Sequence, residues 1–146
     1  MKYKGQKDVA YKLGQVFGKE LTSSGIASMY DIITAVPLHN SRLRQRGYNQ
    51  SDEWALGISD STNIEFVPNV LSRRFKTTTQ TKMTRARRWE NVKEVFFAKE
   101  PESIKGKRVL LVDDVVTTGS TLESCSQALL NGGCDSVGVA CIASAV

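Results

Sequence analysis

The stretch that decides the fold reads VLLVDDVVTTGST and runs from Val109 to Thr121. Its first four residues are apolar, which is typical of a buried strand, and two carboxylates follow where that strand is expected to end. Hydroxyl residues and a glycine come next, directly before an expected helix. Because a helix N-terminus presents free backbone N–H groups, it favours a phosphate. The stretch therefore predicts a strand–loop–helix unit that binds a phosphorylated ligand.

The side chains of this loop suit a phosphorylated sugar. Asp113 and Asp114 can accept hydrogen bonds from sugar hydroxyls, and we expect Gly119 to adopt a positive φ or to let the backbone approach the phosphate. Ser120 or Thr121 is expected to cap the helix that follows. The residues that can hold the phosphate are Thr117, Thr118, Gly119, Ser120 and Thr121.

A nucleoside triphosphatase is the competing interpretation, since such proteins also place an acidic strand end beside magnesium. That class needs a G-x-x-x-x-G-K-[ST] loop elsewhere in the chain. The nearest match, GQVFGK at Gly14–Lys19, is one residue short, lies inside an expected helix and is followed by Glu20. The sequence therefore argues against a triphosphatase.

The remaining elements follow from hydrophobic periodicity. We expect a polar basic loop over 39–49, and a long polar segment without strand character from Arg73 to about Trp89. Asn49 or Ser51 can cap the helix that begins near residue 51. Strands separated by helices predict one α/β domain over 1–146, with a parallel sheet and helices on both faces. The expected helices cover about 7–22, 51–59 and 121–130, and the expected strands 32–36, 64–71 (interrupted at Pro68), 94–98, 108–112 and 136–142.

The overall composition is that of a soluble globular protein, 40% hydrophobic and 24% charged. No apolar run is long enough to span a bilayer, and no apolar segment follows the basic N-terminus, so we expect a cytoplasmic protein without a membrane partner. The three cysteines, Cys125, Cys134 and Cys141, lack C-x-x-C spacing, and His39 is the single histidine. We therefore expect buried thiols and no metal site built from protein ligands.

The positive charge is concentrated in one segment. Residues 73–93 hold eight Lys or Arg against one acid, Glu90, whereas the whole chain has a net charge of +5. Such a cluster is typical of proteins that bind an anionic partner, either a phosphorylated ligand or a nucleic acid. A merely solvated surface remains the alternative.

Three blocks of sequence carry a resemblance to a known family. LLVDDVVTTGST closely resembles the signature of type I phosphoribosyltransferases. VPLHNSRLRQRGYNQS (36–51) and QTKMTRARRWENVKEVF (80–96) resemble a narrower group, the ComF-like competence proteins, often described as predicted amidophosphoribosyltransferases. The blocks occur in the family's order from about Lys2 to the C-terminus, so the resemblance covers nearly the whole chain.

The resemblance implies a type I phosphoribosyltransferase fold: an α/β domain whose central, mostly parallel sheet is flanked by helices, with a flexible loop of about 74–91 and a small hood. It implies that Asp113 and Asp114 hold the ribose hydroxyls of phosphoribosyl pyrophosphate and act as the catalytic acids, Asp114 being the closer to the reaction. Thr117–Thr121 would hold the 5′-phosphate. Arg42 and Arg46 become candidates for the pyrophosphate, and magnesium would bind mainly through phosphoribosyl pyrophosphate.

The implied activity is transfer of ribose 5-phosphate to a nitrogen nucleophile that the sequence does not identify. A non-catalytic module that binds the same donor remains open, as do a ComF-like accessory factor that contacts single-stranded DNA and a homodimer. ComF-like proteins often carry a zinc ribbon before this domain. The present sequence opens at the domain itself, so we expect no ribbon function from it.

Overall fold

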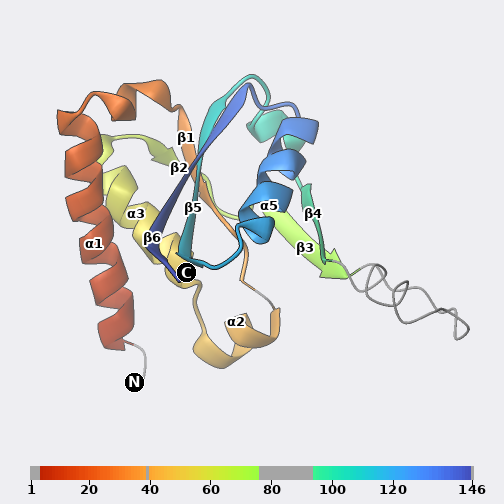
Figure 1. Cartoon of the computed structure of the whole chain (residues 1–146), viewed down its shortest axis with the longest axis horizontal. Coiled ribbons are helices and arrows are strands. Elements are labelled where there is room, and N and C mark those ends of the chain that lie inside the picture. The colour runs from red at the N-terminus through yellow and green to blue at the C-terminus, as the bar shows by residue number, and fades with distance from the viewer. Residues whose placement is uncertain (1–3, 39, 76–93, 146) are drawn as a thin grey trace, which may run out of the picture.

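The deciding stretch forms strand β5 (Arg108–Val116) and the start of helix α5 (Ser120–Asn131) in the computed structural model, which describes residues 4–38, 40–75 and 94–145 (Figure 1). β5 is central in a parallel sheet with the order β2-β1-β5-β6. Its neighbours are β1 (Ile32–Ala35) and β6 (Ser136–Ser144), and β2 (Glu65–Phe66) pairs with β1.

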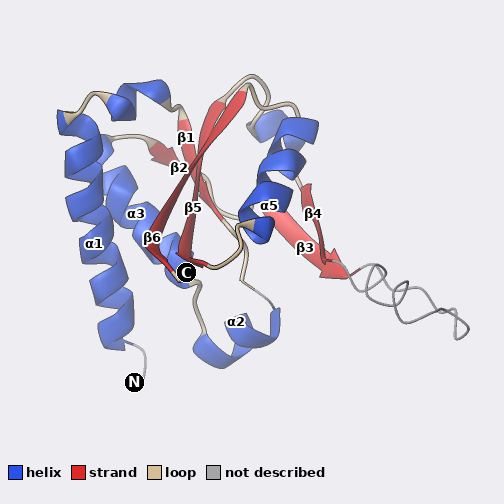
Figure 2. Ribbon diagram, viewed as in Figure 1, coloured by secondary structure: helices blue, strands red, loops and turns tan. Residues whose placement is uncertain are grey.

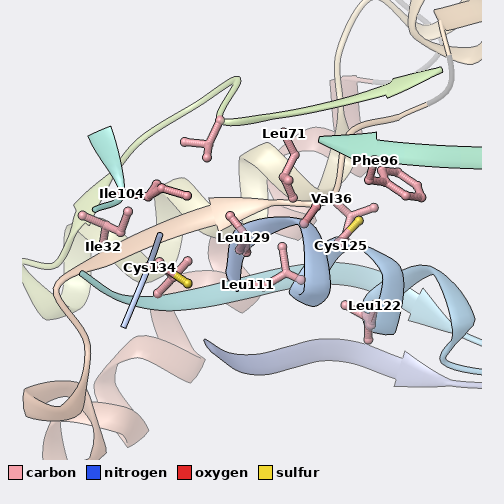
Figure 3. Close-up of a cluster of buried hydrophobic side chains, with 13 residues drawn as sticks. Ile32, Val36, Leu71, Phe96, Ile104, Leu111, Leu122, Cys125, Leu129 and Cys134 are labelled. Atoms are coloured by element: carbon pink, nitrogen blue, oxygen red, sulfur yellow. The ribbon is translucent and has the colours of Figure 1, made fainter. Parts of the chain in front are cut away.

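Helices cover both faces of this sheet, as Figure 2 shows. On one face, α1 (Lys4–Ser23) packs against α3 (Gln50–Thr62), and Trp54 and Ile58 of α3 bury Ile33 of β1 and Leu110 and Val112 of β5. On the other face, α5 supplies Cys125 and Leu129 against Ile32 and Leu111 (Figure 3). The predicted α/β architecture, with a parallel sheet and helices on both sides, is confirmed.

A separate antiparallel sheet joins β3 (Leu71–Phe75) to β4 (Glu94–Ala98), with Leu71 opposite Ala98 and Phe75 opposite Glu94. The expectation that strand character is lost from Arg73 onward is therefore wrong. Cross-strand hydrogen bonds to β4 keep this basic stretch extended despite its polar side chains. The predicted flexible loop of 74–91 lies, beyond Phe75, outside the described residues.

Two further expectations need correction. Strand β5 continues through the carboxylates to Val116, because β6 pairs alongside it as far as Val116 opposite Ser144. The expected loop over 39–49 contains a short helix, α2 (Asn40–Arg46). Leu, Arg and Gln favour helix, and Gly47, with φ of 81°, ends it by donating its N–H to the Leu43 carbonyl over 2.7 Å. Two 3-10 turns, η1 (Ile26–Met29) and η2 (Pro101–Ser103), complete the described elements.

The glycines of the GQVFGK stretch have a packing role in α1. A Cβ on Gly14 would overlap the Trp54 carbonyl oxygen, and one on Gly18 would overlap the Ser61 hydroxyl. Gly57 of α3 faces the Tyr11 carbonyl oxygen in the same way. The glycines thus let the backbones of α1 and α3 approach each other closely. No helix in the described part of the chain is both long and apolar enough to cross a membrane.

An ion pair fastens β1 to β5 at the amino ends of the two strands. Arg108 donates from Nη2 to Asp31 Oδ1 over 3.0 Å and from Nε to Asp31 Oδ2 over 3.1 Å. The Arg108 backbone N–H adds a third bond of 2.8 Å to Asp31 Oδ2. The side-chain bonds from Arg108 first, and then its backbone bond, lower the pKa of Asp31 from 3.8 to about 2.

This pKa predicts an acid-dependent loss of stability. Because the pKa of Asp31 is lower in the folded chain than in the unfolded chain, its contribution is complete above about pH 4 and is lost as the pH falls towards 2. We expect Asp31→Asn to lower the melting temperature at pH 7 and to flatten its decline between pH 4 and pH 2. Circular dichroism melts over this range measure both effects. Glu102→Gln, at an exposed acid of η2, is the matched control, and an equal flattening in it would contradict the assignment.

Candidate functional site

The acidic pair lies at the carboxyl edge of the parallel sheet. Ala35 of β1 is paired with Val112 of β5, so the chain leaving β1 and the two aspartates emerge at the same edge. Helix α5 begins at Ser120, after the five residues Val115–Gly119 that follow Asp114. Carboxyl ends of parallel strands are where open α/β sheets bind ligands. The structure therefore places the carboxylates and the hydroxyl-rich loop together, as predicted.

Asp113 is half-buried, and one of its oxygens is fixed by two donors. Its Oδ1 accepts the Ser51 hydroxyl over 3.2 Å and the Asp114 backbone N–H over 2.8 Å. Burial raises the pKa of Asp113 from 3.8 to about 6, and the bond from Ser51 acts in the opposite direction. Oδ2 is left as the acceptor for a ligand, with the carboxyl group held in one orientation.

Asp114 is held by its own strand, since its Oδ1 accepts the Val115 backbone N–H over 2.7 Å. The side chain is partly exposed, unlike the buried residues 109–112 that precede the pair. Both aspartates therefore keep one oxygen on a local backbone N–H, and the neighbouring Asp114 carboxyl adds to the raised pKa of Asp113. The described residues contain no group of three or more His, Cys, Asp or Glu arranged to hold a metal ion.

The loop after β5 leaves the start of α5 without a side-chain cap. Gly119 is the N-cap, with φ of 83°, which confirms the positive φ expected there. The expectation that Ser120 or Thr121 caps the helix is wrong, because both belong to its first turn. Thr118 Oγ1 instead lies 3.0 Å from the Ser120 hydroxyl and 3.3 Å from its backbone N. The Ser120 N–H thus donates to Thr118 Oγ1, whereas the N–H groups of Thr121 and Leu122 are open to an anion.

A small cavity connects the loop to Asp113. Its volume is about 40 Å³, several times the roughly 10–15 Å³ that one water needs. Its lining includes the side chain or backbone of Asp113, Val116, Thr117, Thr118, Gly119 and Thr121. One concave site therefore combines a carboxylate acceptor with the N-terminus of a helix.

The structure defines the other predicted site residues less completely. Arg42 and Arg46 belong to α2, which follows β1 at the carboxyl edge (Figure 1). Arg46 is half-exposed at the end of that helix. The side chain of Arg42 and the whole of His39 lie outside the described residues. The assignment of these arginines to the pyrophosphate stays a prediction.

Ser51 is the site residue that the sequence did not reveal. The sequence predicts only a helix-cap role for Ser51, and Asn49 fills that role by accepting the Ser51 backbone N–H over 3.1 Å. The Ser51 side chain is 3% exposed and contacts Asp113, 62 residues away in the chain. Its spacing from Asn49 gave no signal of this contact, because the contact depends on how α3 packs beside β5.

Ser51→Ala should raise the pKa of Asp113 further above about 6, because the lost hydroxyl stabilises the ionised carboxylate. Carbon NMR of the labelled carboxyl groups measures this pKa directly. Ser59→Ala is a matched control, since the Ser59 hydroxyl donates to the Ile64 carbonyl near the other end of α3. An unchanged Asp113 pKa in Ser51→Ala would contradict the role given to this hydrogen bond.

Comparison with known proteins assigns a family to this fold and site. Residues 44–145 match the family described as "Phosphoribosyl transferase domain". The matched range contains both aspartates and the whole loop before α5. His39 and Arg42 precede it, whereas Arg46 lies within it.

Curated relatives carry two different names. The chain is 36% identical over 112 residues to DNA utilization protein YhgH of Escherichia coli strain K12, covering 77% of this chain and 48% of that protein. It is 31% identical over 146 residues to the protein of the same name in Salmonella typhimurium, covering 97% and 63%. Competence protein F of Haemophilus influenzae is 36% identical over 110 residues, covering 75% and 48%. The chain thus spans about half to two thirds of the length of these relatives.

Solved structures agree on the fold. The allosteric regulatory enzyme of purine biosynthesis gives a TM-score of 0.58 at 24% identity, covering 90% of this chain and 26% of that one. Purine phosphoribosyltransferase from Pyrococcus horikoshii gives 0.55 at 19% identity, covering 96% and 81%. At these identities the likeness concerns the fold. Together with the family match and the curated relatives, it shows that this chain belongs to the phosphoribosyltransferase family, among relatives of the ComF and YhgH type.

Proposed function

We propose that this chain binds phosphoribosyl pyrophosphate with magnesium and transfers its ribose 5-phosphate to a nitrogen nucleophile, releasing pyrophosphate. The observation that carries the proposal is that one and the same cavity is lined by Asp113 and by the start of α5, which has no side-chain cap. A phosphate at the helix start and a sugar at the carboxylates require this juxtaposition.

Each part of the donor has a candidate partner. The 5′-phosphate would accept hydrogen bonds from the first-turn N–H groups of α5 and from the hydroxyls of Thr117–Thr121. Asp113 and Asp114 would accept hydrogen bonds from the ribose hydroxyls with the oxygens that their local backbone bonds leave open. Arg42 and Arg46 would meet the pyrophosphate, whose oxygens match the planar fork of arginine.

The same groups would favour transfer of the ribose. As the bond to pyrophosphate breaks, negative charge grows on the leaving group and positive charge on the ribose ring. The arginines stabilise the negative leaving group, and the carboxylates stabilise the positive ring. Because these charges are larger in the transition state than in the bound donor, the interactions stabilise the transition state more and lower the barrier. The hard oxygen ligands of the donor and of the aspartates suit magnesium, which would supply further positive charge at the pyrophosphate.

Isothermal titration of the whole chain with phosphoribosyl pyrophosphate, with and without magnesium, tests donor binding. We expect saturable binding that requires magnesium. Pyrophosphate release across nucleobases, ammonia and glutamine then separates an enzyme from a binding module. Silence with every acceptor, despite donor binding, would support the non-catalytic alternative, and absence of donor binding would refute both.

A role with DNA is a second candidate, favoured by the names of the curated relatives and by the cluster of positive charge at 73–93. Electrostatic binding to single-stranded DNA weakens steeply as salt increases. Fluorescence anisotropy with a labelled oligonucleotide between low and physiological salt measures this slope. Binding that is undetectable at low salt would remove this candidate.

A further inference from the structure

A second cavity, of about 150 Å³, lies between the end of β1, the first turn of α3 and the β3–β4 sheet. It is separate from the cavity beside Asp113, and the two share no lining residue. Its position follows from the shortness of β2, which pairs with β1 only at Ile32 and Ile33. In the part of the chain that the structure describes, no strand neighbours the remaining part of that edge of β1, because β3 belongs to the other sheet.

The walls of this cavity carry opposite charges. Asp52 projects from the first turn of α3, whereas Arg73 of β3 and Lys99, just after β4, line the cavity from the other sheet. The Arg73 guanidinium lies 5.2 Å from the centre of the Phe96 ring. Between the charged walls the lining is mixed: Ala35, Pro37, Leu38, Leu43 and Leu71 are apolar, whereas Asn49, Asn69 and Ser72 are polar.

The Asp52 carboxylate is half-buried, and no residue in the described part of the chain donates a hydrogen bond to it. Burial first, and then the neighbouring Glu53, raises its pKa from 3.8 to about 6, and no cation lowers that pKa. Asp52 is therefore not already neutralised by Arg73 or Lys99 across the cavity. A carboxylate in this position gains from a ligand that donates N–H bonds, because its partial desolvation is otherwise uncompensated.

Size and charge together define the ligand. A cavity of about 150 Å³ has room for a molecule the size of benzene, so a ligand of roughly five to ten non-hydrogen atoms fits. Phosphate and pyrophosphate would meet the negative charge of Asp52. We propose that this cavity binds a small amino carboxylate, with its amine on Asp52 and its carboxylate towards Arg73 and Lys99. The proposal does not depend on phosphoribosyl transfer.

A length series of amino carboxylates tests the proposal with the full chain. Glycine, β-alanine and 4-aminobutyrate place the amine and the carboxylate at increasing separations, and titration calorimetry or chemical-shift perturbation measures their binding. We expect saturable binding of at least one of them, about tenfold tighter than propylamine or butyrate, which carry one end each. If none of the three binds, or if propylamine or butyrate binds as tightly, the proposal is overturned.

Substitutions on the two walls test which wall binds the amine of the probe and which binds its carboxylate. Asp52→Asn and Lys99→Met should each weaken binding of the best probe about tenfold, whereas Glu102→Gln and Lys105→Met, at exposed positions outside the cavity, should not. Lys99 is exposed, so its variant remains informative even where Asp52→Asn folds poorly. Unaltered affinity in Lys99→Met and in folded Asp52→Asn would overturn the assignment.

Inorganic pyrophosphate provides the distinguishing competitor. If it displaces the amino carboxylate and binds more tightly to Asp52→Asn, the cavity belongs to the pyrophosphate of the donor, and the present proposal fails. If pyrophosphate does not displace the amino carboxylate, this cavity is distinct from the site that binds the pyrophosphate of the donor. Asp52→Asn should leave binding of magnesium phosphoribosyl pyrophosphate within about twofold, because Asp52 does not line the cavity beside Asp113.

Discussion

Asp113→Asn is expected to weaken binding of magnesium phosphoribosyl pyrophosphate by about 10- to 100-fold, and Asp114→Asn by a similar factor. Each substitution removes a charged acceptor for the ribose hydroxyls while keeping the shape of the side chain. An asparagine oxygen at 113 can still accept the Ser51 hydroxyl and the Asp114 backbone N–H, so the local structure should persist. Titration calorimetry at pH 7.5 measures the loss.

The stability of Asp113→Asn should change in the opposite direction. Because burial raises the pKa of Asp113 to about 6, the folded chain binds more protons than the unfolded chain between about pH 4 and pH 6. Ionised Asp113 therefore reduces stability as the pH rises through this window, and the reduction persists above it. The asparagine variant should melt at a higher temperature than the parent at pH 7.5, and this advantage should shrink towards pH 4.

Opposite effects on binding and stability would identify Asp113 as a residue retained for its ligand, as in other sites where function opposes stability. Asp135→Asn is the control for loss of a negative charge, since Asp135 is exposed just before β6, at the amino edge of the sheet. Unchanged donor binding in Asp113→Asn, or an equal loss in Asp135→Asn, would contradict the proposed ribose contact.

The acidic loop was predictable because its information is local. Four apolar residues bury a strand, the carboxylates follow it, and Gly119 takes the positive φ that its position requires. The two faces of the sheet were also predictable, since helical spacing in α3 and α5 places their apolar residues on one side each. For these features, neighbouring residues in the chain are also neighbours in space.

The features that sequence reasoning missed depend on contacts between distant segments. Ser51 meets Asp113 across 62 residues, and the β3–β4 pairing connects strands on either side of residues 76–93. The cavity lined by Asp52 and Lys99 likewise needs three elements in place before it exists. In each case a local pattern, such as a serine near a helix start, had an adequate local explanation that concealed the tertiary one.

The glycines of α1 illustrate this limit and lead to the largest expected effect on stability. The spacing in GQVFGK argues against a phosphate-binding loop. The sequence alone does not explain why two glycines lie inside a helix, since glycine weakens helices. The structure supplies one: Gly14 faces the Trp54 carbonyl, and Gly57 of α3 faces the Tyr11 carbonyl. Backbone atoms cannot rotate out of the way as side chains can, so an added methyl group must push the helices apart.

Gly14→Ala is therefore expected to destabilise the fold by about 2–3 kcal/mol, measured by urea denaturation, even though alanine is the better helix former. Moving α1 away from α3 would also loosen the stacking of Phe17 on Trp54, whose ring centres lie 5.2 Å apart. Gly5→Ala is the matched control, because a Cβ at Gly5 of the same helix has no heavy atom within 4 Å. If helix propensity alone decided the outcome, both variants would be at least as stable as the parent protein. A loss confined to Gly14→Ala would instead show that close contact between backbones holds α1 on the fold, and comparable stability of the two variants would exclude that contact.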